Sequence, residues 1–261
     1  MTVILTHETP DLDALGSLAL ARRLHPGAAA VVTGGLFAAV ATAFNLGRDA
    51  IGWMEWDEYA RDQRARPENG EAGAVIVDTH TARRLGPAHG LAGQVTEIWD
   101  HHAMGDLQAP AGSVRPAGSC VTLLAARLTA QALEPTPLEA TLALAGLMSD
   151  TGGLLAPEVT AEDFQAAAWL ARTADLDRVR ELTADPLPPA ARALLADLLA
   201  QGKVVNLRGR AVLSYQARLP HPLQAAPVAS DALEASGVDA VALALNNPEG
   251  EGTDVILRGR A

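Results

Sequence analysis

The chain has 261 residues, of which 49% are hydrophobic and 20% charged, and its formal net charge is −11. This length predicts one large domain or two small ones, and the composition indicates a packed core rather than disorder. The acidic total excludes a general nucleic-acid binder, which carries a basic face, so we expect long nucleic acid to be held weakly. A short anionic substrate is compatible with this charge if metal ions or a few arginines supply local positive charge.

The cysteine content and the N-terminal segment predict the compartment. Cys120 is the single cysteine, which rules out an internal disulfide and fits a reducing cytoplasm. The segment MTVILTHE lacks the basic and apolar regions of a signal peptide, and no stretch approaches the roughly 18 uncharged apolar residues of a spanning helix. We therefore expect a soluble, cytoplasmic protein with no membrane partner.

The first half of the chain alternates short apolar runs with helical patterns. Helices are predicted at 15–24 and 36–47. Strands are predicted at VIL (3–5), AAAVVTGG (28–35), AGAVIVD (72–78) and QVTEIWD (94–100). The strand at 72–78 is continuously apolar, which is typical of a strand covered on both faces. The alternation predicts an α/β domain with a mainly parallel sheet and flanking helices.

The middle of the chain is helical, and the tail returns to strands. Helices are predicted at 120–133, 137–150, 160–173 and 187–202. In the third of them, Thr160 is the expected N-cap and Asp163 completes a sequence close to a capping box. The tail pattern, with strands around a short helix, predicts a small α+β C-terminal domain. We divide the chain into a catalytic domain at 1–160, a helical linker at 161–202 and a second domain at 203–261.

Aspartates and histidines recur where the predicted elements end. THETPDLDALGS (6–17) follows the first strand, WDHH (99–102) closes another, and aspartates end the strand at 72–78 and the helix at 137–150. The side chains concerned are His7, Asp11, Asp13, Asp78, Asp100, His101, His102 and Asp150. A single aspartate at a strand end is commonly only a helix N-cap. The carboxyl ends of parallel strands meet at one edge of a sheet, however, so four independent occurrences indicate one site.

Carboxylates that converge at one edge repel one another unless positive charge lies between them. A pair of divalent metal ions is the simplest neutralising group. Mixed carboxylate and imidazole ligands suit Mn²⁺, and we keep Mg²⁺ or Co²⁺ as alternatives. A water shared by two such ions loses a proton near neutral pH and can then act as a nucleophile.

These segments together resemble the four motifs of the DHH phosphoesterase superfamily. THETPDLDALGS has the His-x-x-x-Asp-x-Asp spacing of the first motif, and VIVDTHTARRLG (75–86) is similar to the second. WDHH matches the third and GLMSDTGGL (146–154) the fourth, so all four occur in order within the first 155 residues. The segment EATLALAGLMSDTGGL also resembles the DHH module that some bacteria fuse to CBS domains and tRNA nucleotidyltransferases.

The resemblance implies a role for each matched residue. Two metal ions, usually manganese in the family, would be held by His7, Asp11 and Asp78 on one side and by Asp13, Asp78, His101 and Asp150 on the other. Asp78 would bridge the ions, so catalysis is expected to depend on it. His102 would face the substrate phosphate and donate a hydrogen bond or a proton, and Asp100 would orient a histidine from behind.

The tail resembles part of the DHHA1 domain, which supplies substrate contacts in these enzymes. VILRGR (255–260) is similar to its Arg-Ser strand motif, so Arg258 matches the arginine, whose guanidinium suits phosphate oxygens. A solvated arginine is an equally weighted interpretation. The glycine-rich motif ending in histidine is not found in the sequence, so we expect a truncated DHHA1 domain and weak substrate capture. Cys120, where relatives often carry threonine, is expected to be a buried residue at a helix start rather than a nucleophile.

Three functions are compatible with the sequence. The leading one is a manganese-dependent phosphohydrolase or phosphodiesterase acting on small phosphate esters such as short oligonucleotides, pAp or a cyclic dinucleotide. The second is an inorganic pyrophosphatase, which shares the four motifs and usually needs a basic C-terminal cluster. The cations available for that cluster are Lys203, Arg208, Arg210, Arg218, Arg258 and Arg260. The third is a metal- or nucleotide-binding regulatory module without turnover. A small anionic phosphate is the expected ligand in each case, and a second copy of the chain, in a homodimer, is an alternative partner.

Overall fold

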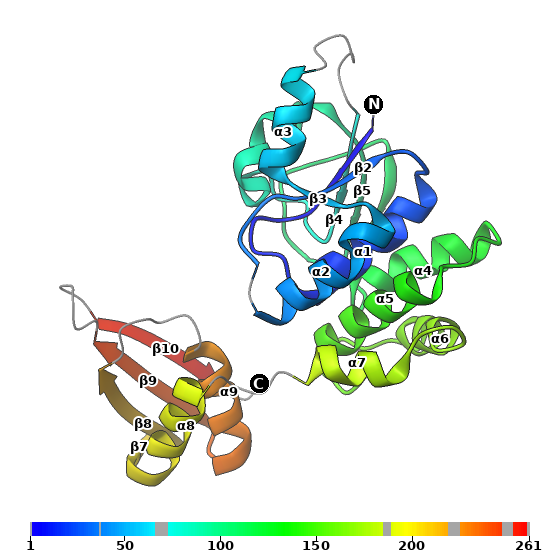
Figure 1. The fold of residues 1–261 in the computed structure, drawn as a ribbon. Helices are drawn as coiled ribbons and strands as arrows, with labels where there is room; N and C mark the ends of the chain where they lie inside the picture. Colours follow the sequence, from blue (N-terminus) through cyan, green and yellow to red (C-terminus); the bar gives the residue numbers. More distant parts are fainter. Residues whose placement is uncertain are drawn as a thin grey trace. The chain divides into compact units, whose positions relative to one another are not determined.

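The computed structural model describes residues 2–36, 38–65, 73–184, 189–218, 225–246 and 253–259, and Figure 1 shows its ribbon. The chain forms two compact units, 1–185 and 186–261. Helices α6 (Ala161–Leu170) and α7 (Leu176–Thr183) belong to the first unit and α8 (Pro189–Gln201) to the second. The segment 161–202, predicted as a linker, is therefore divided between the two units.

The first unit is built on a six-stranded parallel sheet in the order β3-β2-β1-β4-β5-β6. The strands are β1 (Val3–Leu5), β2 (Ala29–Val32), β3 (Met54–Glu55), β4 (Ala74–Val77), β5 (Val95–Asp100) and β6 (Ala111–Val114). This architecture confirms the predicted α/β fold. The sequence did not predict the edge strands β3 and β6, because one has two residues and the other, AGSV, carries little strand propensity.

Helices cover both faces of this sheet. One core contains Val75 and Val77 of β4. The helices that pack into it are α1 (Leu12–Leu24), α2 (Ala38–Ile51), α4 (Cys120–Ala130) and α5 (Pro137–Asp150). Helix α3 (Trp56–Ala65) and the 3₁₀ segment η1 (Ala82–Gln94) contribute to the other, which receives Ile76. Successive residues of β4 therefore enter opposite cores, which explains why its apolar run is continuous.

The helix predicted at 36–47 extends to Ile51, so Gly47 does not end it. A Cβ atom at Gly47 would lie 2.2 Å from Cζ2 of Trp53, so the indole packs against a helix position that only glycine fits. Trp53 is buried, stacks on Phe44 with ring centroids 5.7 Å apart, and donates from Nε1 to the Phe44 carbonyl at 2.9 Å. The helix stops before Gly52, whose φ of +75° suits a glycine after a helix end.

Asp163 ties the start of α6 to the start of α4. The capping box with Thr160 is present, as predicted, and the Asp163 carboxylate also accepts from Gly118 N at 3.1 Å and from the Thr122 hydroxyl. Asp163 is fully buried. Burial raises the pKa of its carboxyl, but the hydrogen bonds from Thr122, Thr160 and Gly118 outweigh burial and lower the pKa overall.

We expect Asp163→Ala to lower the free energy of unfolding by about 2–4 kcal/mol, because several buried donors lose their acceptor. Because the folded-state pKa is depressed, this contribution is present above the unfolded pKa and is lost as the pH falls through the folded value. Urea denaturation measures both effects. Glu162→Ala, which removes an exposed carboxylate on the same helix, is the control and should cost at most about 1 kcal/mol. If both variants lost the same free energy of unfolding, the stabilising role given to the buried Asp163 carboxylate would be contradicted.

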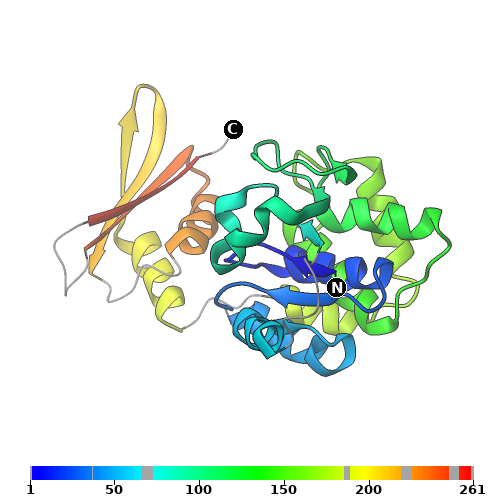
Figure 2. The same ribbon diagram turned by 90° about the horizontal axis from the view of Figure 1, so that it is seen from above.

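The second unit is a small α+β structure. Its mixed four-stranded sheet has the order β10-β9-β8-β7, with β8 and β9 parallel and the outer pairs antiparallel. The strands are β7 (Lys203–Leu207), β8 (Arg210–Arg218), β9 (Ala240–Asn246) and β10 (Thr253–Gly259). Helices α8 and α9 (Ala225–Ser236) lie on the same face of the sheet, where they cover Val241, Leu243 and Leu245 (Figure 2). No helix within the described ranges of either unit has the length and apolar character needed to cross a membrane.

Candidate metal centre

The predicted metal ligands gather where the strand order reverses. Strand β1 lies between β2 and β4, and the chain runs outward through β2 and β3 before it returns to β4 on the other side. The segments that leave β1 and β4 therefore diverge, which is the position where α/β sheets bind ligands. His7 follows β1, Asp78 follows β4, and the distance from His7 Nε2 to Asp78 Oδ2 is 3.2 Å.

Three groups of side chains at this edge each have ligand atoms within 4.8 Å of one another, and one of them is Asp78, Asp100, His101 and His102. The other two contain the six predicted ligands: the first is His7, Asp11 and Asp78, and the second is Asp13, His101 and Asp150. The groups are contiguous, because His101 Nε2 lies 3.4 Å from Asp78 Oδ1, 3.3 Å from Asp150 Oδ2 and 3.8 Å from Asp13 Oδ2. The fold thus brings together all six side chains that the resemblance implies as metal ligands.

Asp78 lies between the two groups. Its side chain is buried, and Oδ1 makes no hydrogen bond among the described residues. Its φ is +59°, a left-handed conformation that is uncommon outside glycine and that aspartate tolerates better than most residues. His101 Nε2 is an ion-pair partner 3.4 Å from this oxygen but makes no hydrogen bond to it. A buried carboxylate oxygen that lacks a hydrogen bond is costly unless a ligand satisfies it. The cluster of carboxylates and imidazoles around this oxygen fits a divalent metal ion.

Burial, together with the charges of neighbouring groups, determines the protonation of the cluster. Burial raises the pKa of Asp13 well above its ordinary value, and it raises the pKa of Asp150 to about 6. Burial also raises the pKa of Asp78, but His101 and His7 outweigh it and lower the pKa to about 2. For His101, burial lowers the pKa, but the neighbouring carboxylates raise it to about 10. In the metal-free protein the His101 imidazolium therefore supplies the positive charge that a divalent ion would supply.

Two of the candidate ligands also cap helices. Asp11 is the N-cap of α1, and its Oδ1 accepts from Ala14 N at 2.9 Å. Asp13 accepts from the Ser119 hydroxyl at 2.9 Å and from Cys120 N at 2.8 Å, at the start of α4. A carboxylate has enough lone pairs to cap a helix and bind a metal ion together. Cys120 is fully buried at the first position of α4, as expected for a structural residue rather than a nucleophile.

Asp13 and Asp150 meet because α1 and α5 pack closely. A Cβ atom at Gly146 would lie 2.5 Å from the Leu12 carbonyl oxygen and 2.8 Å from Asp13 Cα. We expect Gly146→Ala to push the helices apart, lower the free energy of unfolding by about 1–3 kcal/mol, and weaken Mn²⁺ binding.

Calorimetric titration with Mn²⁺ and urea denaturation measure the two effects of Gly146→Ala. Gly90→Ala is the matched control, because a Cβ atom at Gly90 would meet nothing within 4 Å. Unchanged Mn²⁺ affinity in a destabilised Gly146→Ala protein would show that the helix spacing does not set the site.

Behind the metal ligands lies a chain of three side chains. The ring of His102 is 41% exposed, and its Nδ1 donates to Asp100 Oδ1 at 2.7 Å. Asp100 is fully buried, and its Oδ2 is hydrogen-bonded to His80 Nδ1. The bond to Asp100 raises the pKa of His102. Sequence reasoning missed His80, because the second motif resemblance gave a role only to Asp78, and His80 meets Asp100 only in the folded chain.

Arg258 lies in the second unit, exposed on β10, and its Nη1 donates to the Leu257 carbonyl at 3.3 Å. Lys203, Arg208 and Arg210 are exposed in the same unit. Arg260 lies outside the described residues, as does the side chain of Arg218. The role of Arg258 in substrate binding therefore stays a prediction.

Comparison with curated proteins finds relatives of the chain. It is 32% identical over 234 residues to an A-adding tRNA nucleotidyltransferase of Geobacter sulfurreducens, and the alignment covers 85% of this chain and 25% of that protein. It is 33% identical over 108 residues to a probable manganese-dependent inorganic pyrophosphatase of Deinococcus radiodurans, and this alignment covers 40% of this chain and 34% of that protein. The chain thus spans about a quarter to a third of the length of these relatives. No family model matches it.

Solved structures share the fold. An exopolyphosphatase-related protein from Bacteroides fragilis superposes with a TM-score of 0.78 at 17% identity, covering 100% of this chain and 79% of that one. A putative family II inorganic pyrophosphatase from Methanococcus jannaschii superposes with a TM-score of 0.58 at 19% identity, covering 99% and 87%. The relatives and these structures are consistent with a member of the DHH phosphoesterase superfamily.

Proposed function

We propose that the chain is a metal-dependent phosphohydrolase that binds two divalent ions, with Mn²⁺ as the expected metal. The observation that carries the proposal is the buried Asp78 Oδ1, which has no hydrogen bond to any of the described residues and lies between two groups of candidate ligands. His7 and Asp11 would hold one ion with Asp78, and Asp13, His101 and Asp150 would hold the other. When bound, such ions activate water and neutralise phosphoryl charge.

His102 is the residue proposed to act on the substrate. Because its Nδ1 donates to Asp100, its Nε2 is left for the phosphate or for the leaving oxygen. Asp100 favours the protonated imidazole, since it faces the ring with a buried carboxylate. The imidazolium can then donate a hydrogen bond to a phosphate oxygen or a proton to the leaving group.

The proposed substrates are small phosphate esters, such as a short oligonucleotide, pAp or a cyclic dinucleotide. The net charge of −11 supports a small substrate over long nucleic acid. Arg258 would contribute a phosphate contact from the second unit. Inorganic pyrophosphate is the alternative substrate, favoured by the similarity to a probable manganese-dependent inorganic pyrophosphatase.

A substrate panel with Mn²⁺ tests the proposal. It would contain bis-p-nitrophenyl phosphate, a dinucleotide, pAp, cyclic di-AMP and pyrophosphate. Turnover of the esters above that of pyrophosphate supports the phosphoesterase, and the reverse order supports the pyrophosphatase. Mn²⁺ binding without turnover of any compound would leave a regulatory module and would contradict the proposed function.

A further inference from the structure

We propose that His80 is a positioning residue, which holds Asp100 and, through Asp100, the ring of His102 in the orientation that presents Nε2 to the substrate. The inference rests on the proposed function and deepens it. It assigns a role to a buried histidine that follows the carboxyl end of β4 and that has no role in the motif resemblance. The ring of His80 is hydrogen-bonded to Asp100, which is not among the six side chains assigned to the ions, so its effect on the reaction would be indirect.

The hydrogen bonds of Asp100 determine which nitrogen of each ring carries a proton. Asp100 Oδ1 accepts from His102 Nδ1 at 2.7 Å and from His102 N at 3.2 Å. Asp100 Oδ2 is bonded to His80 Nδ1. A carboxylate only accepts hydrogen bonds, so both Nδ1 atoms must donate. The arrangement therefore fixes the Nδ1–H form of His102 and leaves its Nε2 free for the substrate.

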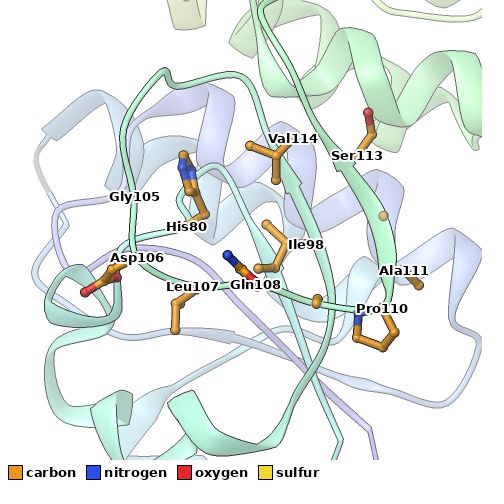
Figure 3. Close-up of a pocket in the computed structure, with 12 residues that line it drawn as sticks. His80, Ile98, Gly105, Asp106, Leu107, Gln108, Pro110, Ala111, Ser113 and Val114 are labelled. Atoms are coloured by element: carbon orange, nitrogen blue, oxygen red, sulfur yellow. The ribbon is translucent and has the colours of Figure 1, made fainter.

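His80 is itself held in place from two sides. Its carbonyl oxygen accepts from Asp106 N and Leu107 N, each at 2.9 Å. The loop that follows β5 also packs on its ring, since a Cβ atom at Gly105 would lie 2.0 Å from His80 Cδ2 (Figure 3). His80 is 8% exposed. Such anchoring of ring and backbone is typical of a side chain whose orientation matters.

Loss of His80 should loosen His102. Asp100 is fully buried, so its Oδ2 would have no partner, and the carboxylate would shift or rotate to find one. The ring of His102 is partly exposed, and Asp100 provides its close hydrogen bond. Residues that orient a functional side chain from behind commonly matter for turnover. We therefore expect kcat to fall while KM and the affinity for Mn²⁺ stay near the wild-type values.

Three substitutions at His80 separate positioning from simple structural damage. With Mn²⁺ and bis-p-nitrophenyl phosphate, His80→Ala should lower kcat by roughly 10–100-fold. His80→Asn should recover most of kcat, because its amide nitrogen takes the place of Nδ1 and donates to Asp100. His80→Gln places its amide nearer the position of Nε2, so it should lose kcat like alanine. His89→Ala removes an exposed histidine from η1 and should change nothing.

The cavity beside His80 offers a further readout. Together with the loop after β5 and strand β6, His80 lines a cavity of about 520 Å³ (Figure 3). Imidazole added to His80→Ala can reach the vacated space through it and donate to Asp100. We expect added imidazole to restore part of kcat in His80→Ala and to leave His80→Asn unchanged. A merely structural role for His80 predicts no such rescue.

A measurement without turnover keeps this inference apart from the proposed function. Long-range ¹H–¹⁵N spectra of the metal-free protein, recorded at an alkaline pH where the ring is neutral, report the tautomer of His102. Wild type and His80→Asn should show the Nδ1–H form, and His80→Gln should show a mixture. If the spectra are as expected but the protein hydrolyses none of the substrates, the proposed function is refuted and the role of His80 in orienting His102 is supported. Wild-type spectra or wild-type kcat in His80→Gln would overturn the role of His80.

Discussion

Replacing Asp78 by asparagine should lower kcat on a phosphate ester by on the order of 10³-fold or more, which corresponds to about 4 kcal/mol in the activation barrier. Asp78 faces both groups of candidate ligands, so its carboxylate would serve both ions. Asparagine keeps the shape of the side chain and tolerates the φ of +59° at this position, so the fold should be retained. Alanine would add backbone strain to the loss of the ligand.

The effect of Asp78→Asn is checked by steady-state kinetics and by calorimetric titration with Mn²⁺, which should show at least one site lost. Asp49→Ala, which removes an exposed carboxylate from α2, is the control and should leave both measurements unchanged. Circular dichroism confirms that the variant is folded. Wild-type turnover in a folded Asp78→Asn protein would refute the two-metal mechanism.

Removal of divalent ions should destabilise the protein at neutral pH and much less at pH 4.5. Burial raises the pKa of Asp150 to about 6 in the metal-free fold, above its value in the unfolded chain. At a pH between these two pKa values, the folded state therefore binds more protons than the unfolded state. The metal-free protein therefore loses stability as the pH rises through this interval. The pKa of Asp78 in the fold is about 2, so its contribution to stability is constant across this pH interval and is lost only at lower pH.

Adding Mn²⁺ at pH 7.5 should reverse this loss. An ion present at about 100 times its dissociation constant stabilises the folded state by about 2.7 kcal/mol, which raises Tm by about 5–10 °C for a unit of this size. Differential scanning calorimetry with chelator and with Mn²⁺ measures the shift. In Asp150→Asn the decline with pH should be smaller and the Mn²⁺ shift weaker. A Tm that does not respond to Mn²⁺ at pH 7.5 would count against the metal centre.

The sequence by itself determined the fold class and the composition of the candidate site. Short apolar runs that alternate with helical patterns predict a parallel sheet, because each strand of such a sheet is buried on both faces. Asp78 and the pair His101 and His102 directly follow β4 and β5, and His7 follows β1 closely. Parallel strands end at one edge, so adjacency along the chain was enough to predict that these residues meet.

Only the tertiary structure decided which contacts support that site. Asp13 caps α4 across 106 residues, His80 meets Asp100 across 20, and the contact of α1 with α5 depends on Gly146. The division into units at 185 and 186, and the continuation of α2 past Gly47, likewise depend on packing between segments distant in sequence. Such contacts follow from the register and spacing of packed elements, and a shift of one residue in a strand would turn its side chains to the opposite face. Local patterns therefore determine which residues end the strands, whereas packing determines what lies behind them.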